Sequence, residues 1–258
     1  MKSRVFSPTD SWFPYRTESG AAQLFCLPYA GGGASRFLPL ARQLAPAIEV
    51  LPVQPPGREA RLREPPARHA SEIVDALLPS LLPRLDRPYA VLGYSLGALV
   101  GFELVRALAR EGAPPPIGLI AAAAVPPPRR VRAEHRSRLA DAELAAVIGD
   151  MGGTPSQVLQ DPDLLAMVLP LMRADLTVWE TYECPFDAQV NCPVAAYGGR
   201  DDPGTPANRL RHWHDATTAT ARLRMFDGGH FFGFEQPVAF GAAVAADLSC
   251  WLGQGRTP

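Results

Sequence analysis

The residues in this chain that could carry out chemistry are a serine, one of two neighbouring aspartates and a histidine, in that order. Ser95 is the centre of Gly-Tyr-Ser-Leu-Gly, which follows an apolar run and precedes a helical pattern. The spacing G-x-S-x-G is typical of a nucleophile elbow, a strand-to-helix turn so sharp that glycines must flank it. We predict that Ser95 is a nucleophile. The alternative is an ordinary serine that lies between two glycines by chance.

A serine nucleophile needs a base, and one of the five histidines stands in a suitable place. His230 lies in Asp-Gly-Gly-His-Phe-Phe, directly after the last apolar strand pattern, where the base of such a hydrolase belongs. The other histidines occupy polar segments or a helix beside a tryptophan, and we assign them no role: His69, His135, His212 and His214. We expect His230 to take the proton from Ser95.

The third group is an acid, and two candidates share one loop. Asp201 and Asp202 stand in Gly-Gly-Arg-Asp-Asp-Pro-Gly-Thr-Pro after an apolar run. The common pattern after such a strand is G-x-x-D-x-x-x-P. If the pattern starts at Gly199, it matches Asp202 and Pro206. If it starts at Gly198, it matches Asp201 but has no proline at its last position. We favour Asp202 as the group that would stabilise the imidazolium, and Asp201 is the alternative.

An acyl-transfer site also needs two donors for the oxyanion. The backbone N–H after the nucleophile is that of Leu96, and the second donor comes from the loop after an early strand. That loop is Tyr-Ala-Gly-Gly-Gly, and we choose the N–H of Ala30 within it. A phosphate-binding turn is the other interpretation of these glycines, but neither G-K-[ST] nor G-x-G-x-x-G completes it.

The elements that must position these groups alternate along the chain. Short apolar runs predict strands at 21–28, 48–54, 89–94, 117–125, 194–199 and 221–226. Amphipathic patterns predict helices at 35–44, 69–85, 98–110, 206–214 and 237–252. Such alternation is typical of a mostly parallel, doubly wound sheet, which makes this an α/β protein.

The alternation is interrupted at residues 126–192, where we expect helices and no strand. Helical patterns cover 140–149 and 163–182, the second as one helix or two. An insertion after a strand lies over the carboxyl edge of a parallel sheet, where ligands bind. We therefore predict a helical lid within a single domain of residues 1–258.

The composition excludes several classes of protein. Hydrophobic residues make up 47% and charged residues 20%, and the formal net charge is -1. We expect neither nucleic acid nor a membrane as a partner. An apolar run of spanning length and a signal peptide are both missing, so we expect a cytoplasmic protein. The sequence does not indicate an oligomeric state, and a monomer is the default expectation. The four cysteines have no metal-binding spacing, which predicts small buried thiols, no metal and no cofactor.

With these residues in view, the chain resembles the type II thioesterases. These are stand-alone hydrolases of the α/β-hydrolase superfamily that accompany polyketide synthases and nonribosomal peptide synthetases. The resemblance spans nearly the whole chain. It rests on LFCLPYAGGGAS, VQPPGREARLREPP, GYSLG, LPLMRADLTVWETYE, GGRDDP and GGHFFGFE. One departure is Tyr94, which stands where the family elbow usually has histidine; we expect catalysis to survive it.

The resemblance implies a substrate and a role. The substrate is an acyl group on the phosphopantetheine arm of an acyl or peptidyl carrier protein, and its removal would let a stalled synthase resume. Apolar lid residues are candidates for an acyl chamber, although each could instead pack the lid onto the body: Met151, Leu164, Leu165, Met167, Leu169, Leu171 and Met172.

Charged residues of two motifs have proposed roles as well. Arg58, Arg61 and Arg63 could contact an acidic carrier protein or the phosphate of its arm, or could form a solvated loop face. Asp175, in the Arg-Ala-Asp triplet, is expected to organise the lid through a local ion pair rather than to touch substrate.

Other functions are compatible with the same three residues. A small-molecule esterase or lipase would use them on an oxygen ester. An acyltransferase would pass the acyl group to an acceptor other than water, although the order Ser-Asp-His fits hydrolases better. A carrier-binding module without activity and a chain-releasing thioesterase domain of a larger synthase are further alternatives.

Overall fold

The computed structural model describes residues 11–15, 20–130 and 135–254. Within them the strands form one sheet, in the order β2-β1-β3-β4-β5-β6, and every neighbouring pair is parallel. The strands are β1 (Ala22–Leu27), β2 (Ile48–Pro52), β3 (Tyr89–Tyr94), β4 (Gly118–Ala122), β5 (Val194–Gly199) and β6 (Ala221–Phe226). The predicted α/β class with a parallel sheet is confirmed.

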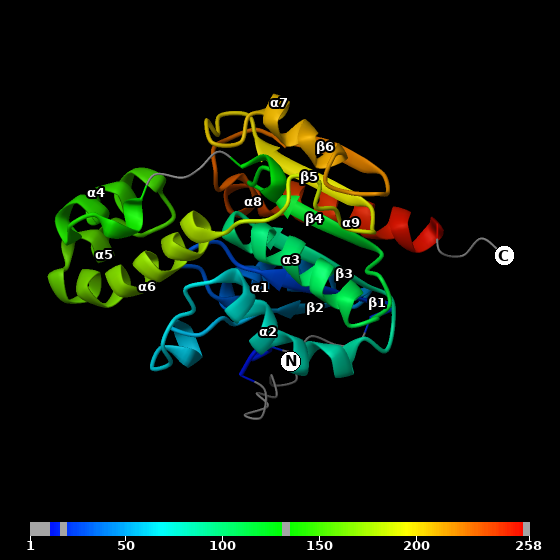
Figure 1. The fold of residues 1–258 in the computed structure, drawn as a ribbon, viewed down its shortest axis with the longest axis horizontal. Helices are drawn as coiled ribbons and strands as arrows, with labels where there is room; N and C mark the ends of the chain where they lie inside the picture. Colours follow the sequence, from blue (N-terminus) through cyan, green and yellow to red (C-terminus); the bar gives the residue numbers. More distant parts are fainter. Residues whose placement is uncertain (1–10, 16–19, 131–134, 255–258) are drawn as a thin grey trace.

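Helices cover both faces of this sheet. Figure 1 shows α2 (Ala70–Leu81) and α3 (Leu96–Arg110) in front of it, and α9 (Pro237–Gln254) behind it. The helix α1 (Leu38–Leu44) packs beside α9. Alternate residues of β1 divide between the two layers: Leu24 and Cys26 belong to the α1–α9 cluster, and Phe25 and Leu27 to the α2–α3 cluster. Burial on both faces explains why the strands read as continuous apolar runs.

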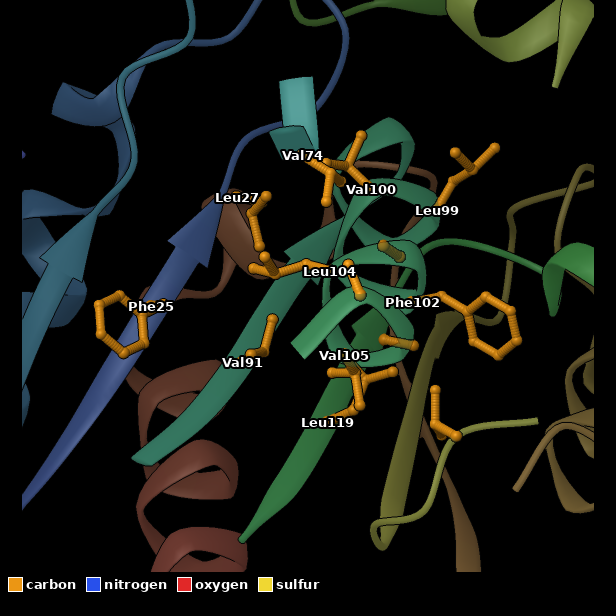
Figure 2. Packing of buried hydrophobic residues seen from close by; sticks show 14 of the residues in the cluster. Phe25, Leu27, Val74, Val91, Leu99, Val100, Phe102, Leu104, Val105 and Leu119 are labelled. Atoms are coloured by element: carbon orange, nitrogen blue, oxygen red, sulfur yellow. The ribbon is translucent and has the colours of Figure 1, made fainter. Parts of the chain in front are cut away.

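The helix α3 provides much of one core layer. Figure 2 shows its side chains Val100, Leu104 and Val105 gathered against Val91 of β3 and Leu119 of β4. Each of these five is at most 3% exposed. Full burial of such a side chain stabilises the fold by about 1.5–3 kcal/mol. This layer holds the helix that begins directly after Ser95.

The strand order places a topological switch point between β1 and β3. From β1 the chain moves outward to β2 and then returns to add β3 on the other side of β1. In open parallel sheets, ligands bind at the carboxyl ends of the strands on either side of such a point. Ala30 follows β1 and Ser95 follows β3, so the two groups that the sequence singles out lie on opposite sides of one crevice.

The described part of the segment 126–192 contains helices and no strand, and its only strand-like pairing is the isolated bridge of Val190 with Thr217. It contains α4 (Asp141–Met151), α5 (Ser156–Gln160) and α6 (Pro162–Thr181), which lie together at one side of the sheet (Figure 1). The Asp161 carboxylate caps α6 by accepting from the N–H groups of Asp163 and Leu164. Leu144, Ile148, Leu169, Met172 and Leu176 form its small core. Residues 131–134 of the predicted lid lie outside the described residues.

Several element boundaries differ from the prediction. The α-helix in the expected helix 69–85 ends at Leu81, and a 3-10 turn (Leu82–Arg84) follows it. Pro83 in this turn has no backbone N–H with which to continue the α-helical hydrogen bonds. The expected helix 206–214 is the short α7 (Ala207–Leu210) followed by a 3-10 turn. The helices α5 and α8 (Phe232–Glu235) were not predicted; both are too short for a clear periodicity.

The cysteines are free, but they are not alike. Cys26 and Cys192 are buried, as predicted, and burial raises the pKa of Cys192 to about 12. Cys250 is exposed, so the expectation of burial is wrong for it, because it lies on the outer side of α9. In the described ranges no helix is long and apolar enough to cross a membrane, and no acidic, histidine or cysteine cluster could hold a metal ion.

Candidate active site

Ser95 occupies a strained turn between β3 and α3. Its φ of 53° and ψ of −116° lie in a region that side chains rarely adopt. Glycines make the turn possible: a Cβ on Gly93 would lie 2.1 Å from the carbonyl oxygen of Gly97, and one on Gly97 would lie 2.2 Å from that of Leu27. The backbone is therefore that of a nucleophile elbow, with Ser95 immediately before the N-terminus of a long helix.

Three side chains from separate loops meet at this turn. His230 Nε2 lies 2.9 Å from Ser95 Oγ, and His230 Nδ1 lies 2.7 Å from Asp202 Oδ2. Ser95 follows β3, Asp202 follows β5 and His230 follows β6, so parallel strands deliver all three to one edge of the sheet. This is the hydrogen-bond chain by which a histidine can accept the hydroxyl proton while a carboxylate orients it.

The loop after β5 directs one of its two aspartates inward. Asp202 is 6% exposed and accepts hydrogen bonds from the N–H of Gly204 at 2.8 Å and the hydroxyl of Thr205 at 2.7 Å. Asp201 is exposed. Burial opposes ionisation of Asp202, but the contact with His230 and these donors outweigh it, so its pKa lies below the ordinary value. Sequence reasoning missed Thr205. The available signal was Asp-Pro-Gly, which is typical of a turn in which the aspartate accepts from the N–H two residues on.

The remaining histidines lie elsewhere. His69 Nδ1 lies 3.5 Å from the Thr181 hydroxyl, and His212 lies 3.1 Å from Asp215 at the surface. His135 and His214 are exposed. In the described part of the chain, His230 is the histidine that hydrogen-bonds to Ser95.

The loop after β1 forms a tight turn beside the elbow. The N–H of Gly32 donates to the carbonyl oxygen of Tyr29 at 2.8 Å, and Gly31 has a φ of 76°, as at the third position of a type II turn. Ala30 and Leu96 both line the cavity that contains Ser95 and His230. Among the described residues, no acceptor is found for either N–H. Both are therefore free to donate to a ligand.

Tyr94, the departure from the usual family pattern, is fully buried behind the elbow. Its hydroxyl donates to the carbonyl oxygen of His230 at 2.6 Å and accepts from the N–H of Gly233 at 3.3 Å. Aromatic rings surround it, among them Phe231 and Phe234. Burial raises its pKa well above the ordinary value, so the phenol keeps the proton that it donates. The side chain thus joins the turn of Ser95 to the loop of His230.

Two cavities open from Ser95. A cavity of about 330 Å³ has walls from Val125, Arg130, Trp179 and Arg209, in addition to the three site loops. A second, of about 160 Å³, lies between Tyr29, Met172 and Phe231 and is closed by residues 151–155. Ser95, Ala30 and His230 line both. A substrate with its reacting carbon at Ser95 therefore has space on two sides.

The candidate acyl-chamber residues divide into three groups. Met151 and Met172 line the smaller cavity. Leu165, Leu169 and Leu171 pack within the fold. Leu164 and Met167 are 42% and 55% exposed and line neither cavity, so the expectation that they face a chamber is wrong. The spacing of apolar residues could not distinguish these three groups, because α6 packs both on the other helices of its segment and on α3.

Two expectations about charged residues need correction. Arg58 is 5% exposed and forms a bidentate ion pair with Asp175, 117 residues further along the chain, so it is neither a partner contact nor part of a solvated loop. The ion pair of Asp175 is thus long-range rather than local. Arg61 pairs with Glu64 and stacks on Trp12. Of the three arginines, Arg63 is the exposed one.

The fold defines the class of protein. This is an α/β-hydrolase-like fold, and a Ser95–His230–Asp202 hydrogen-bond chain lies at the carboxyl edge of its parallel sheet.

The thioesterase domain model matches residues 22–247, and the chain belongs to that family of thioester hydrolases. It is 34% identical over 231 residues to the gramicidin S biosynthesis protein GrsT of Aneurinibacillus migulanus, which covers 89% of this chain and 90% of the relative. It is 36% identical over 219 residues to thioesterase PikA5 of Streptomyces venezuelae, covering 83% of this chain and 76% of the relative.

Solved structures show the same relationship. The type II thioesterase BorB of the borrelidin biosynthetic cluster superimposes with a TM-score of 0.84 at 35% identity, over 94% of this chain and 99% of that one. The RedJ thioesterase of the prodiginine pathway in Streptomyces coelicolor gives 0.81 at 32% identity, over 89% and 86%. The predicted resemblance to type II thioesterases is confirmed.

Proposed function

We propose that this enzyme hydrolyses acyl thioesters on the phosphopantetheine arm of acyl or peptidyl carrier proteins, and so clears stalled acyl groups from a polyketide or nonribosomal peptide synthase. Its family and its relatives in such pathways support the reaction and the setting. The catalytic groups would be Ser95, His230 and Asp202, with Ala30 and Leu96 as oxyanion donors. The helical segment 126–192 would act as the lid of a single domain.

The first half-reaction transfers the acyl group to Ser95. As Oγ attacks the thioester carbon, its proton moves to His230 Nε2, and Asp202 stabilises the imidazolium through Nδ1–H. The carbonyl electron pair moves onto oxygen, where the two backbone N–H groups would hold it. The C–S bond then breaks, and the departing sulfur takes the proton from Nε2.

The second half-reaction releases the acid. A water molecule gives its proton to His230 Nε2 as it attacks the acyl-enzyme, through a second oxyanion in the same hole. Collapse of this intermediate breaks the bond to Ser95 Oγ, which regains its proton. The enzyme ends unchanged, with a carboxylic acid and a free thiol as products.

The observation that carries the proposal is the pair of cavities that meet at Ser95. An acyl thioester extends in two directions from its reacting carbon, with the acyl group on one side and the pantetheine arm on the other. Both cavities have mostly apolar walls, and Met172 and Phe231 in the smaller one suit it to the acyl group. The larger one also has the cations Arg130 and Arg209 in its wall, which suit the phosphate and polar groups of the arm.

The test is release of an acyl group from a loaded carrier protein. Intact-protein mass spectrometry would follow a propionyl carrier with wild type and with Ser95→Ala. We expect release by wild type and loss of at least 10³-fold in the variant. Preference for a simple oxygen ester would instead indicate an esterase, and transfer to an added thiol or amine an acyltransferase. No release from several acyl carriers would overturn the proposal.

A further inference from the structure

A buried ion pair joins the lid helix to the body of the enzyme beside the site. Arg58 Nη1 and Nη2 donate to Asp175 Oδ2 and Oδ1 at 2.7 and 2.9 Å, and the two side chains are 6% and 2% exposed. Arg58 belongs to the loop after β2, and Asp175 to α6. A buried ion pair contributes little net stability compared with apolar residues of similar size, so stability alone is a weak explanation for it.

Both partners also form hydrogen bonds with the loop after β1. The N–H of Gly31 donates to Asp175 Oδ2 at 2.7 Å, and Arg58 Nη1 donates to the carbonyl oxygen of Gly32 at 3.3 Å. One turn earlier on α6, Met172 lies so close that a Cβ on Gly31 would be 2.6 Å from its sulfur. The peptide that follows Ala30 is therefore held by Asp175 of α6, and the carbonyl group at the end of the same turn, that of Gly32, is held by Arg58.

These hydrogen bonds orient the N–H of Ala30, the proposed oxyanion donor. Gly31 has a positive φ inside the turn, and glycine adopts positive and negative φ about equally readily, so its own sterics do not fix this conformation. The contacts of the turn therefore determine it. Ala30 itself packs against the lid core, and the direction of its N–H is set by the next peptide. Displacement of a donor by about 1 Å can cost on the order of 10²-fold in rate.

We propose that Asp175 and Arg58 are positioning residues that shape the oxyanion hole, so that the Ala30 N–H is aligned only while α6 is docked on the body. The inference rests on the proposed function, because it assumes that Ala30 donates to the oxyanion. It links lid closure to catalysis: an undocked α6 removes the acceptor of the Gly31 N–H, and the hole relaxes.

A nearby arginine on the same helix serves as a matched control. Arg173 bonds to the carboxylate of Asp141 at 2.6 Å and to the carbonyl oxygen of Leu139 at 2.8 Å, both within the lid segment. It has no hydrogen bond to the loop after β1 among the described residues. Arg173→Met therefore removes a lid anchor and leaves the oxyanion loop untouched.

The experiment compares wild type with Asp175→Asn, Arg58→Met and Arg173→Met on propionyl carrier protein. We expect kcat to fall by about 10–100-fold in the first two variants with KM within about threefold, and to stay within about threefold of wild type in Arg173→Met. The second readout is inhibition by an alkyl trifluoromethyl ketone, whose adduct with Ser95 carries an oxyanion. Its affinity should weaken in parallel with kcat, because both depend on the same donor.

Folding is checked by near-ultraviolet circular dichroism and thermal unfolding. If Arg58→Met does not fold, Arg58→Lys replaces it, since lysine keeps the charge but cannot reach both carboxylate oxygens and the Gly32 carbonyl together. Unchanged kcat and ketone affinity in folded variants, or equal losses in Arg173→Met, would overturn the inference. Failure of the proposed function would be seen separately, as no release by wild type or full release by Ser95→Ala.

Discussion

At the residue scale, the side chain before Ser95 connects the turn of Ser95 to the loop of His230. Tyr94 donates to the carbonyl oxygen of His230 and lies in contact with the aromatic rings that follow it. A hydroxyl in this place holds the backbone of the histidine loop, while the ring fills the space behind it. Tyr94 therefore supports the backbone of the His230 loop, and the hydrogen bonds of His230 to Ser95 and Asp202 are present beside it.

This role predicts the effect of Tyr94→Phe, which removes one oxygen and keeps the ring. We expect a loss of about 1 kcal/mol in the free energy of unfolding, because a buried carbonyl loses its donor. We also expect kcat to fall about tenfold with little change in KM. Tyr89→Phe is the control: its hydroxyl donates to the Pro114 carbonyl at the far end of β3. Equal kcat in the two variants would contradict the role.

The two aspartates of the loop after β5 predict opposite outcomes. Asp202→Asn should lower kcat by about 10³–10⁴-fold, since an amide would favour the wrong histidine tautomer. Asp201→Asn changes an exposed side chain and should leave kcat within about twofold. Steady-state hydrolysis of one acyl-carrier substrate by both variants measures the contrast. Comparable losses would mean that Asp202 is not the acid.

At the scale of elements, three sides of α6 have different surroundings. Asp175 contacts the oxyanion loop, Met172 forms a wall of the smaller cavity, and Met167 faces outward. Arg130 further ties the end of the helix to the start of the segment 126–192 by donating to the carbonyl oxygens of Trp179 and Tyr182. A single helix thus contacts both the loop after β1 and the smaller cavity.

A change at the chamber wall should shift acyl preference. Met172→Ala enlarges the cavity of about 160 Å³, and we expect the ratio of kcat/KM for octanoyl over propionyl carrier to rise by about tenfold or more. The free energy of unfolding should fall by about 2–5 kcal/mol. Met167→Ala, on the exposed side of the helix, should change neither quantity. An unaltered ratio in Met172→Ala would show that the acyl group lies elsewhere.

At the scale of the whole molecule, the strand order brings separated loops to one place. The loops after β1, β3, β5 and β6 supply Ala30, Ser95, Asp202 and His230. Because all these strands are parallel, their carboxyl ends share one edge, and the switch between β1 and β3 opens a crevice there. The segment 126–192 leaves the sheet after β4 and returns at β5, so it lies beside the same edge.

The ionised Asp202 predicts how the stability of the fold depends on pH. Its folded-state pKa is lowered, so its contribution is complete above the unfolded value of about 4 and is lost as the pH falls through the folded value. Below pH 4 the free energy of unfolding of wild type should fall by up to about 1.4 kcal/mol per pH unit more than that of Asp202→Asn. Urea unfolding between pH 6 and pH 3 measures both slopes, and parallel slopes would contradict the shift.

The features that lie within one contiguous stretch of the chain could be predicted from the sequence. Ser95 and the glycines around it are recognisable because the elbow is a contiguous turn with strict steric demands. The alternation of strands and helices followed from apolar period, and parallel pairing followed from the alternation. Even the choice of Asp202 over Asp201 depended on spacing within one loop, and the structure brings Asp202 to His230.

The contacts between segments far apart in the chain could be identified only from the folded structure. The pairing of Arg58 with Asp175 spans 117 residues, and no local pattern distinguishes a buried arginine from an exposed one such as Arg63. The same holds for Tyr94 and His230, and for the side of α6 that Met172 occupies. These contacts depend on how the lid packs on the sheet, and packing is a property of the assembled surfaces rather than of any one segment.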